Sequence, residues 1–576
     1  MFRFHGGMSM ANLNLPLGFE FFSEVIENDC YYIDKTLFIK ELVEEPFKVN
    51  LITRPRRFGK TLAMTMLADF FDIRKNSRSL FQNLKIIKEE ALCRQWMNQW
   101  PVLFLTLKDV DGDRFEDAMD MLKDSISTLF KNHSYLADST AVDLDDQKLF
   151  CKLKAGEGNA SDLKSSLTTL TRMMNAHYHK PVILLIDEYD VPLAKAYDHS
   201  YYQKMLPVIR SLLGRVWKTN PSLKFAVVTG CLRIAKESIF TGANNFISNS
   251  VAGFRYRENF GFSESEVWQL LKDAECLDQY DSLKKWYDGY RFGGSEIYCP
   301  WDVVNHVSLL QKDPTAKPAN YWKDTSHNHI IRKFIDIKGP AIHEKFETLL
   351  SGGIIEEHIV EDLTYDLDHS EEDNLWSILY LTGYLTQAVP DFPSSKCISQ
   401  PERILLKIPN EEVKTIFAET VFRWFKDTLT GNDRSALFKT WWNKEDAQVT
   451  NQVSSILFNT ISYFDYKEDY YHAFLAGLFS GAGYEVSSNS GQGTGRADVT
   501  VKDRQNRRAL IIEVKRSSSE KNMKKDAQDA ISQIIRRQYA ETLLAKGYEM
   551  VLCYGAAFFQ KKCCILCSFG SCNLSA

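Results

Sequence analysis

A short segment near the N-terminus has the composition of a nucleotide-phosphate loop. Residues 54–61 read RPRRFGKT, and the last three match the second half of the pattern GxxxxGK[ST]. In such a loop, backbone N–H groups and a helix N-terminus surround the phosphates. The lysine contacts the outer phosphates and the hydroxyl binds magnesium. The first glycine of the pattern is replaced by Arg54, but the residues that make the main contacts are present. The predicted nucleotide contacts are Arg56, Arg57, Phe58, Gly59, Lys60 and Thr61, together with Asp187.

A pair of acidic residues follows the apolar run at 181–186. Asp187 would hold magnesium directly or through water, with Thr61 as the second protein ligand, and Glu188 would orient and deprotonate an attacking water. The alternative is a simple loop after a core strand. Because both motifs occur in one chain with a strand between them, the sequence predicts ATP and Mg²⁺ as cofactors.

Two further polar residues follow the apolar run at 223–228. Thr229 is either a polar sensor of the γ-phosphate or a capping threonine. Arg233 is either an arginine finger or a partner in a surface salt bridge. The sequence does not decide between these alternatives.

A different constellation lies near the C-terminus. Asp498 ends a Gly-rich loop, and Glu513 and Lys515 follow on an apolar strand, where alternate residues share one face. If the strands pair as a hairpin, Asp498 and Glu513 can bind Mg²⁺ while the Lys515 ammonium activates water or stabilises a phosphate. This is the D-x(n)-E-x-K arrangement of metal-dependent nucleases, and the alternative is an edge strand with a Glu–Lys salt bridge.

The helix that follows this strand offers supporting side chains. Gln533 is predicted to assist the carboxylate–lysine site. Arg536 and Arg537 either contact a phosphate backbone or belong to a solvated helix face.

Strand-like and helix-like segments alternate through the first 230 residues. Apolar runs predict strands, and 3.6-residue spacing predicts helices. Such alternation indicates an α/β fold, a P-loop NTPase parallel sheet with helices on both faces. The predicted strands are 49–53, 102–106, 181–187 and 223–229, and the predicted helices are 60–71, 162–178 and 201–217.

The pattern changes twice along the chain. We predict an AAA-like P-loop domain over 1–260, a mostly helical middle region over 261–464 and a small α/β domain over 465–576. In the last domain, we expect a loop at 489–495, a hairpin about 503–507 and one helix over 524–546.

Charge is distributed unevenly between these parts. The chain of 576 residues has a net charge of −5, but residues 470–576 carry 15 Lys and Arg against 9 Asp and Glu. A net charge of +6 in this segment predicts a polyanion partner such as nucleic acid, and a merely solvated basic surface is the alternative.

Twelve cysteines are scattered along the chain without a secretion signal, and we expect them to be thiols. Cys564 and Cys567 have the spacing of half a zinc site, but the run CCILC favours a buried strand. Since no stretch of 18 uncharged apolar residues occurs, we expect a cytoplasmic protein without a membrane span.

The motifs together resemble a bacterial and archaeal family of AAA-ATPase-like proteins with a C-terminal PD-(D/E)XK nuclease-like domain. The resemblance covers about 15–305 and, less specifically, about 465–560. An arginine at the first phosphate-loop position belongs to the family pattern. The motifs are LPLG at 15–18, YIDKT at 32–36, RPRRFGKT at 54–61, LIDEYD at 185–190, NNF at 244–246, WYDGYRF at 286–292, GRAD at 495–498 and IEVK at 512–515, with Gln533.

Two positions depart from the nuclease pattern. Ala497 replaces the proline of the motif, which is harmless to the chemistry. Tyr471 and His472 stand where an acidic residue often completes the metal site in the first helix, which puts full nuclease competence in question.

Three functions are therefore compared. The first is a weak ATPase coupled to a nuclease-like domain that acts on nucleic acid, with the ATP state gating the C-terminal domain through the middle region. The second is an ATP-dependent switch or scaffold whose C-terminal domain binds nucleic acid or protein without cleavage. A helicase-like motor ranks last, because strand-translocation motifs are not evident. The oligomeric state stays open, with a homo-oligomer among the expectations.

Overall fold

The computed structural model forms two compact units, which are described separately. The first comprises residues 1–326 and 356–413, and the second comprises 327–355 and 414–576. The described residues are 13–45, 47–234, 239, 246–322, 345–346, 348–350, 352–361, 363, 372–388, 403–417, 435–460, 468–481, 484–492, 495–560 and 562–568. Residues 244 and 245 of the NNF motif lie outside this set.

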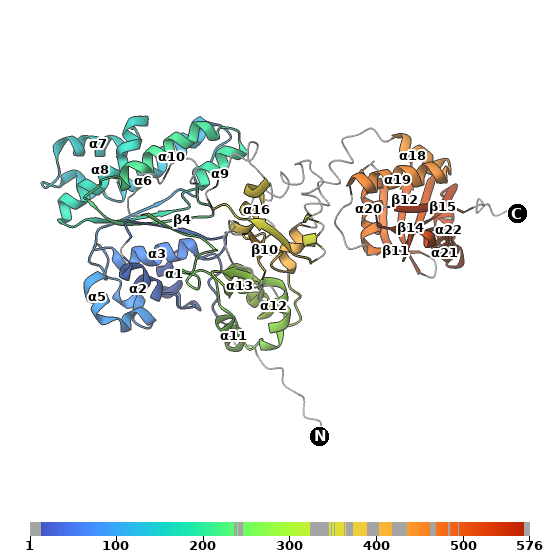
Figure 1. Cartoon of the computed structure of the whole chain (residues 1–576), viewed down its shortest axis with the longest axis horizontal. Helices are drawn as coiled ribbons and strands as arrows, with labels where there is room; N and C mark the ends of the chain where they lie inside the picture. Colours follow the sequence, from blue (N-terminus) through green and yellow to red (C-terminus); the bar gives the residue numbers. More distant parts are fainter. Residues whose placement is uncertain are drawn as a thin grey trace, which may run out of the picture. The chain divides into compact units, whose positions relative to one another are not determined.

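A five-stranded parallel sheet forms the centre of the first unit, in the order β2-β3-β4-β1-β5. Its strands are almost continuously apolar and buried because helices cover both faces (Figure 1). The predicted α/β class and the four predicted strands are confirmed. The strands are β1 (Val49–Thr53), β2 (Val102–Thr106), β3 (Val182–Asp187), β4 (Leu223–Gly230) and β5 (Phe246–Asn249).

The α-helices that precede β4 divide between the two faces of the sheet (Figure 1). One face carries α1 (Phe22–Glu27), α2 (Leu37–Glu44), α3 (Lys60–Phe71), α4 (Arg78–Phe81) and α5 (Glu90–Trp96). The other carries α6 (Phe115–Lys131), α7 (Leu144–Lys154), α8 (Ala160–Tyr178), α9 (Val191–Asp198) and α10 (Tyr202–Trp217). Helix α8 begins at a capping box formed by Asn159 and Asp162.

The middle region combines helices with two small sheets. Ser263 and Glu266 form a capping box at the start of α11. The turn-rich WYDGYRF segment leads into the antiparallel hairpin β6-β7. The helices are α11 (Glu264–Asp273), α12 (Tyr280–Tyr287), α13 (Pro300–Leu310) and α16 (Glu372–Leu381). The strands are β6 (Tyr290–Phe292), β7 (Ser295–Ile297), β8 (Ile355–His358), β9 (Thr386–Gln387) and β10 (Arg403–Lys407).

The second unit contains a five-stranded mixed sheet in chain order, β11-β12-β13-β14-β15. Only the β13–β14 pair is parallel among its described strands. The CCILC run forms β15, as the strand interpretation predicted, but β11 continues to Gln492 into the expected loop. The strands are β11 (Glu485–Gln492), β12 (Gly495–Asp503), β13 (Arg508–Arg516), β14 (Met550–Phe559) and β15 (Lys562–Cys567).

Helices cover both faces of this second sheet. The predicted helix over 524–546 is interrupted at Gln538, whose φ of 54° lies in the left-handed region. The helices are α18 (Ser435–Trp442), α19 (Asp446–Thr460), α20 (Glu468–Gly481), α21 (Met523–Arg536) and α22 (Tyr539–Ala545). Within the described residues, no helix has the length and apolarity that a membrane span requires.

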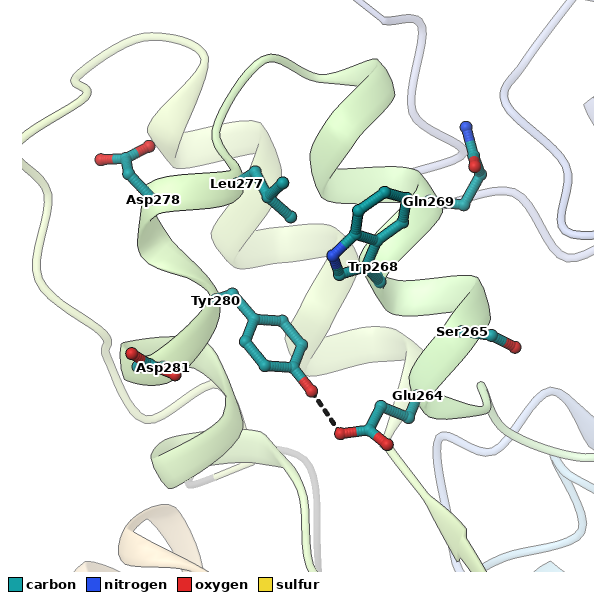
Figure 2. Close-up of a pocket in the computed structure, with 8 residues that line it drawn as sticks. All are labelled: Glu264, Ser265, Trp268, Gln269, Leu277, Asp278, Tyr280 and Asp281. Atoms are coloured by element: carbon teal, nitrogen blue, oxygen red, sulfur yellow. Dashed lines mark hydrogen bonds between the residues drawn. The ribbon is translucent and has the colours of Figure 1, made fainter.

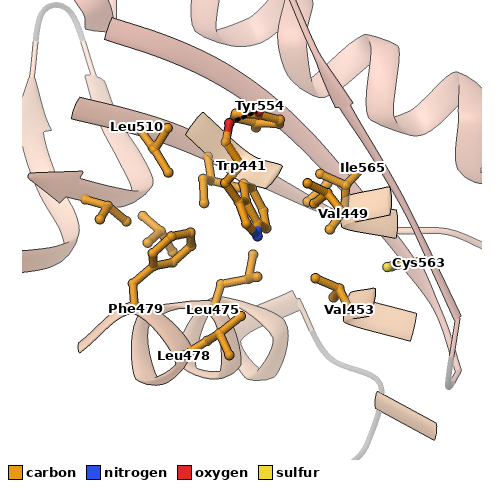
Figure 3. Close-up of a cluster of buried hydrophobic side chains, with 14 of the residues drawn as sticks. Trp441, Val449, Val453, Leu475, Leu478, Phe479, Leu510, Tyr554, Cys563 and Ile565 are labelled. Carbon is orange, nitrogen blue, oxygen red and sulfur yellow. Dashed lines mark hydrogen bonds between the residues drawn. The ribbon is translucent and has the colours of Figure 1, made fainter. Parts of the chain in front are cut away.

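The core of the second unit includes residues upstream of the predicted boundary at 465. Trp441 from α18 and Val453 from α19 pack with Phe479 and the strands (Figure 3). The Tyr554 hydroxyl donates a hydrogen bond to the Trp441 carbonyl. Because these side chains are fully buried, α18 and α19 belong to the same packed unit as the C-terminal sheet.

A buried pair of carboxyl groups joins α13 to the segment after β10. Asp302 and Glu412 are completely buried, and Glu412 Oε1 accepts hydrogen bonds from the Tyr321 and Trp322 N–H groups at 2.6 and 3.0 Å. Burial and the facing Asp302 raise the pKa of Glu412 well above its ordinary value. The folded protein therefore retains a proton that the unfolded chain releases.

This proton predicts a pH-dependent stability. A carboxyl group whose pKa is raised by folding stabilises the folded state most at pH values below its unfolded pKa. This contribution is lost as the pH rises toward the folded pKa. The wild-type free energy of unfolding should fall from pH 5 to 9, by up to about 1.4 kcal/mol per pH unit for one proton. Glu412→Gln preserves the acceptor and removes the titration, so urea unfolding should show a shallower fall.

Glu411→Gln is the matched control at the adjacent, half-buried position. Its free energy of unfolding should depend on pH as that of the wild type does. If the free energies of unfolding of wild type and Glu412→Gln changed equally with pH, Glu412 would not retain a proton in the folded protein.

Candidate functional site

The phosphate loop connects β1 to the first turn of α3. Gly59 occupies the N-cap of α3 with a φ of 79°, a left-handed conformation that glycine adopts without strain. Lys60 is buried, and its Nζ donates hydrogen bonds to the Arg54 and Pro55 carbonyls at 3.1 and 2.8 Å. The lysine ammonium therefore lies inside the curve of the loop, close to the N-terminus of α3.

Asp187 ends the buried strand β3 and meets two hydroxyl groups. Thr61 Oγ1 donates to Asp187 Oδ2 at 2.7 Å, and the Thr229 hydroxyl donates to Asp187 Oδ1. Thr229 thus binds Asp187, a contact that neither the γ-phosphate sensor nor the capping role predicted. The structure brings Lys60, Thr61 and Asp187 together at the carboxyl edge of the sheet, as parallel strands require.

Arg54, at the position of the missing glycine, is fully buried and points away from the loop interior. Its guanidinium donates to the Thr53 and Asn249 carbonyls at 2.8 Å each, and to the Arg255 and Tyr256 carbonyls at 3.2 Å each. Burial lowers the Arg54 pKa to about 9. The arginine fixes the start of the loop against β5 and the segment after it.

Aromatic residues of the middle region pack against Arg57 and Phe58 of the phosphate loop. The Arg57 guanidinium lies 4.2 Å from the centre of the Trp301 ring. The Phe58 ring lies 5.0 and 5.1 Å from the rings of Tyr290 and Phe292. The middle region therefore contacts the phosphate loop directly, whereas the sequence provided no argument for a site there.

Residues 188–190 shape the turn after β3. Glu188 has a φ of 54°, and burial raises the pKa of its carboxyl, an effect that the Lys60 charge opposes. Asp190 Oδ2 accepts hydrogen bonds from the Cys231 and Leu232 N–H groups at 2.9 and 3.0 Å. Sequence analysis assigned Asp190 no role at this site, although it belongs to the LIDEYD motif.

Arg56, a predicted nucleotide contact, and Arg233, either an arginine finger or a salt-bridge partner, differ in their surroundings. Arg56 is half-buried beside Lys60, and its charge acts on the Glu188 carboxyl. The Arg233 guanidinium lies 5.5 Å from the Phe246 ring, and its carbonyl accepts the Leu363 N–H at 3.2 Å. Neither alternative for Arg233 is decided by these contacts.

The predicted carboxylate–lysine site assembles around the β12–β13 pair of the second unit. Asp498 Oδ2 accepts the Val514 N–H at 2.9 Å, and Gln533 from α21 donates to the Glu513 carboxylate. Burial and the Asp498 charge raise the pKa of Glu513 to about 7, while Lys515 opposes the shift. Asp498, Glu513, Lys515 and Gln533 are thus neighbours.

His472 reaches the carboxylate–lysine site, whereas Arg536 and Arg537 make only local contacts. His472 Nε2 from α20 lies 3.3 Å from Asp498 Oδ2, where the family pattern often has an acid. Arg536 Nε donates to the Ser532 carbonyl at 3.3 Å, and Arg537 to the Tyr539 hydroxyl at 3.5 Å. Both arginines are exposed and engaged locally.

The donor atoms fit a hard divalent cation. In the part of the chain that the structure describes, no three His, Cys, Asp or Glu side chains form a closed metal cage. Glu513 Oε2, however, is buried and has no hydrogen-bond partner among the described residues. Two carboxylates and one unsatisfied oxygen suit Mg²⁺, which retains several waters. Thr61 and Asp187 offer a hydroxyl and a carboxylate of the same hard type.

Comparison with known families finds a match over each of the two parts of the chain that contain these groups. A family model described as a predicted AAA-ATPase matches residues 16–240. A model of the PD-(D/E)XK nuclease superfamily matches residues 466–567. The chain contains an AAA-ATPase-like domain and a PD-(D/E)XK nuclease superfamily domain. The resemblance predicted from the motifs is therefore confirmed.

One curated relative spans most of the chain. It is an uncharacterized protein in the vnfD 5′ region of Azotobacter chroococcum mcd 1. The two sequences are 24% identical over 503 residues, covering 85% of this chain and 87% of the relative.

A separate pocket of about 750 Å³ lies between α11 and α12 (Figure 2). Three acidic residues and two aromatic rings line it, and Tyr280 donates a hydrogen bond to Glu264. Lys284 also pairs with Glu264 at 2.5 Å. The lining residues are Glu264, Ser265, Trp268, Gln269, Leu277, Asp278, Tyr280 and Asp281. None of them belongs to either predicted site of the AAA-ATPase-like or nuclease-like domain.

Proposed function

We propose that the AAA-ATPase-like domain binds and slowly hydrolyses ATP, and that the nuclease-like domain uses a divalent metal to act on nucleic acid. The observation that carries the proposal is the 2.7 Å hydrogen bond between Thr61 and Asp187, beside the buried Lys60 ammonium. A lysine, a hydroxyl and a carboxylate at a helix N-terminus are the groups that a Mg²⁺–nucleotide complex requires.

Each residue of the ATP site has a distinct task. Lys60 exchanges its loop carbonyls for outer phosphate oxygens, and the N–H groups of the loop hold the inner ones. Thr61 and Asp187 would hold Mg²⁺, which neutralises phosphate charge when bound. Glu188, adjacent to Asp187 and with a raised pKa, orients and deprotonates water. Arg56 adds positive charge beside the loop.

Lys60→Ala should abolish ATP binding, because no other lysine follows Gly59 at the strand–helix junction. Calorimetric titration with ATP measures the effect. Lys123→Ala on α6 removes the same charge from a surface ion pair and should bind ATP like wild type. Unchanged affinity in a folded Lys60→Ala variant would refute the phosphate-loop assignment.

Glu188→Gln should preserve ATP binding but stop turnover, since the amide keeps the shape and cannot accept a proton. Loss of a positioned base typically costs about 100- to 10,000-fold in rate. Phosphate release and calorimetry, measured on the same preparation, separate the two effects. A wild-type hydrolysis rate would mean that Glu188 has only a structural task.

In the nuclease-like domain, Asp498 and Glu513 would hold the metal, whose chemistry is to stabilise the charge that develops on a phosphate. The Val514 N–H orients Asp498, and Gln533 orients Glu513. Lys515 shares the strand face of Glu513, so its ammonium can activate water or stabilise the phosphate. The surplus of basic residues supports nucleic acid as the partner.

The second candidate is a switch that binds without cleaving, and His472 is the observation that favours it. An imidazole 3.3 Å from Asp498 occupies the neighbourhood where an additional carboxylate would strengthen metal binding. In either case, we propose that ATP state is transmitted through the middle region. The packing of Arg57 on Trp301 and of Phe58 on the β6-β7 hairpin supports this route.

Asp498→Ala should remove cleavage while leaving most substrate affinity, because the basic residues remain. Lys515→Ala should lower turnover more than metal affinity, since an ammonium is not a ligand. The assay uses the full chain with DNA and RNA, Mg²⁺ or Mn²⁺, with and without ATP. We expect Mn²⁺ to support more cleavage than Mg²⁺, because the carboxylate set is small.

Binding in this assay should weaken steeply with salt as counterions are released. Salt-sensitive binding without cleavage under any metal would select the switch. Cleavage that survives in Asp498→Ala would contradict the proposed site.

A further inference from the structure

A second pocket opens at the end of β13, directly after the Glu513–Lys515 motif. Its volume is about 340 Å³. It is lined by Arg516, Ser517, Ser518, Phe558, Phe559 and Gln560. None of these residues has a task in the carboxylate–lysine site described above, although the pocket begins one residue after Lys515.

Ser517 gives this pocket a buried polar group. The residue is 3% exposed, and its N–H donates to the Phe558 carbonyl at 2.8 Å. Its hydroxyl is buried and has no hydrogen-bond partner within the described part of the chain. An unsatisfied buried hydroxyl is unfavourable unless a ligand or water completes its hydrogen bonds. It therefore marks a position prepared for a polar ligand.

The hydroxyl continues the row of catalytic candidates along the strand. The Ser517–Phe558 hydrogen bond extends the pairing of β13 with β14 by one residue. Glu513, Lys515 and Ser517 are thus alternate residues of one extended segment and share a face. Successive members are about 6.6 Å apart along the strand. A ligand extending from Glu513 past Lys515 reaches Ser517 next.

The walls of the pocket combine the groups that bind a nucleotide. Arg516 is an exposed cation, Ser518 is a second hydroxyl, and Phe559 is a half-buried ring. Phe558 is held by a stacked ring, Tyr471, at 4.2 Å and 12°. The Tyr471 hydroxyl donates to the Gln560 carbonyl at 3.0 Å, which holds the backbone directly after β14. Cations, hydroxyls and aromatic rings together suit a phosphate and its base.

We propose that this pocket binds the nucleotide that flanks the one held at Asp498, Glu513 and Lys515, with the Ser517 hydroxyl contacting its phosphate, Phe559 contacting its base and Arg516 adding positive charge at the pocket wall. The inference rests on the proposed action of this domain on nucleic acid. It identifies a strand with at least one nucleotide beyond the reactive phosphate as the substrate. Because a stacked base is recognised by its face, the pocket tolerates different sequences.

The test is fluorescence anisotropy of a labelled single-stranded DNA 12-mer with the full chain in EDTA. Ser517→Ala and Arg516→Ala are introduced alone and together in the Asp498→Ala background. The double change should weaken binding by about tenfold or more, as for loss of hydrogen bonds to a charged group. Loss of Arg516 should reduce the salt slope by about one. Urea unfolding midpoints check that the variants fold.

Arg504→Ala is the matched control, because it removes an exposed arginine of the β12–β13 turn that pairs with Glu485. It should leave affinity nearly unchanged. Equal affinity and salt slope in the pocket variants, or no binding of the 12-mer by the parent protein, would overturn the inference. If the wild-type chain does not cleave but the pocket variants bind the 12-mer more weakly than their parent, only the nuclease proposal is refuted. If the wild-type chain cleaves and the pocket variants bind as tightly as their parent, only the pocket proposal is refuted.

Discussion

The architecture of the AAA-ATPase-like domain depends on one buried carboxylate. Asp187 lies at the end of β3 with no exposed surface, so its oxygens must be satisfied by the protein. Thr61 and Thr229 supply those hydrogen bonds, and they connect α3, β3 and β4 at a single point. The same contact places a hydroxyl and a carboxylate beside Lys60. The hydrogen bonds that satisfy this buried carboxylate therefore also form the proposed nucleotide site.

The phosphate loop is held from two further directions. Arg54 binds backbone carbonyls of β1, β5 and the segment after β5, which a glycine at that position could not do. Arg57 and Phe58 pack on Trp301 and the β6-β7 hairpin. A change in the conformation of the loop on nucleotide binding would therefore alter its contacts with the middle region directly. If the loop binds ATP as proposed, these contacts would transmit a change in the loop to the middle region.

The sequence predicted the elements whose signal is local and strong. The strand runs before Arg54 and Asp187 and the helix after Lys60 required only apolar patterning and motif context. Arg54 and Asn249 are 195 positions apart, Arg57 and Trp301 are 244 apart, and Asp302 and Glu412 are 110 apart. No local sequence pattern could therefore predict these contacts. In the nuclease-like domain, alternation on β13 predicted the shared face of Glu513 and Lys515. The resemblance to the nuclease family placed His472 at the position of a metal-site residue. Alternation on a strand could not predict its 3.3 Å contact with Asp498, because the two residues lie on different elements.

If Asp187 and Thr61 hold a Mg²⁺–nucleotide complex as proposed, calorimetric titration of ATP with and without Mg²⁺ should show it. Wild type should bind ATP more tightly when Mg²⁺ replaces EDTA. Asp187→Asn retains the hydrogen bonds from both threonines but loses the charge, so it should bind ATP in EDTA and gain little from Mg²⁺. An equal gain from Mg²⁺ in both proteins would contradict the account.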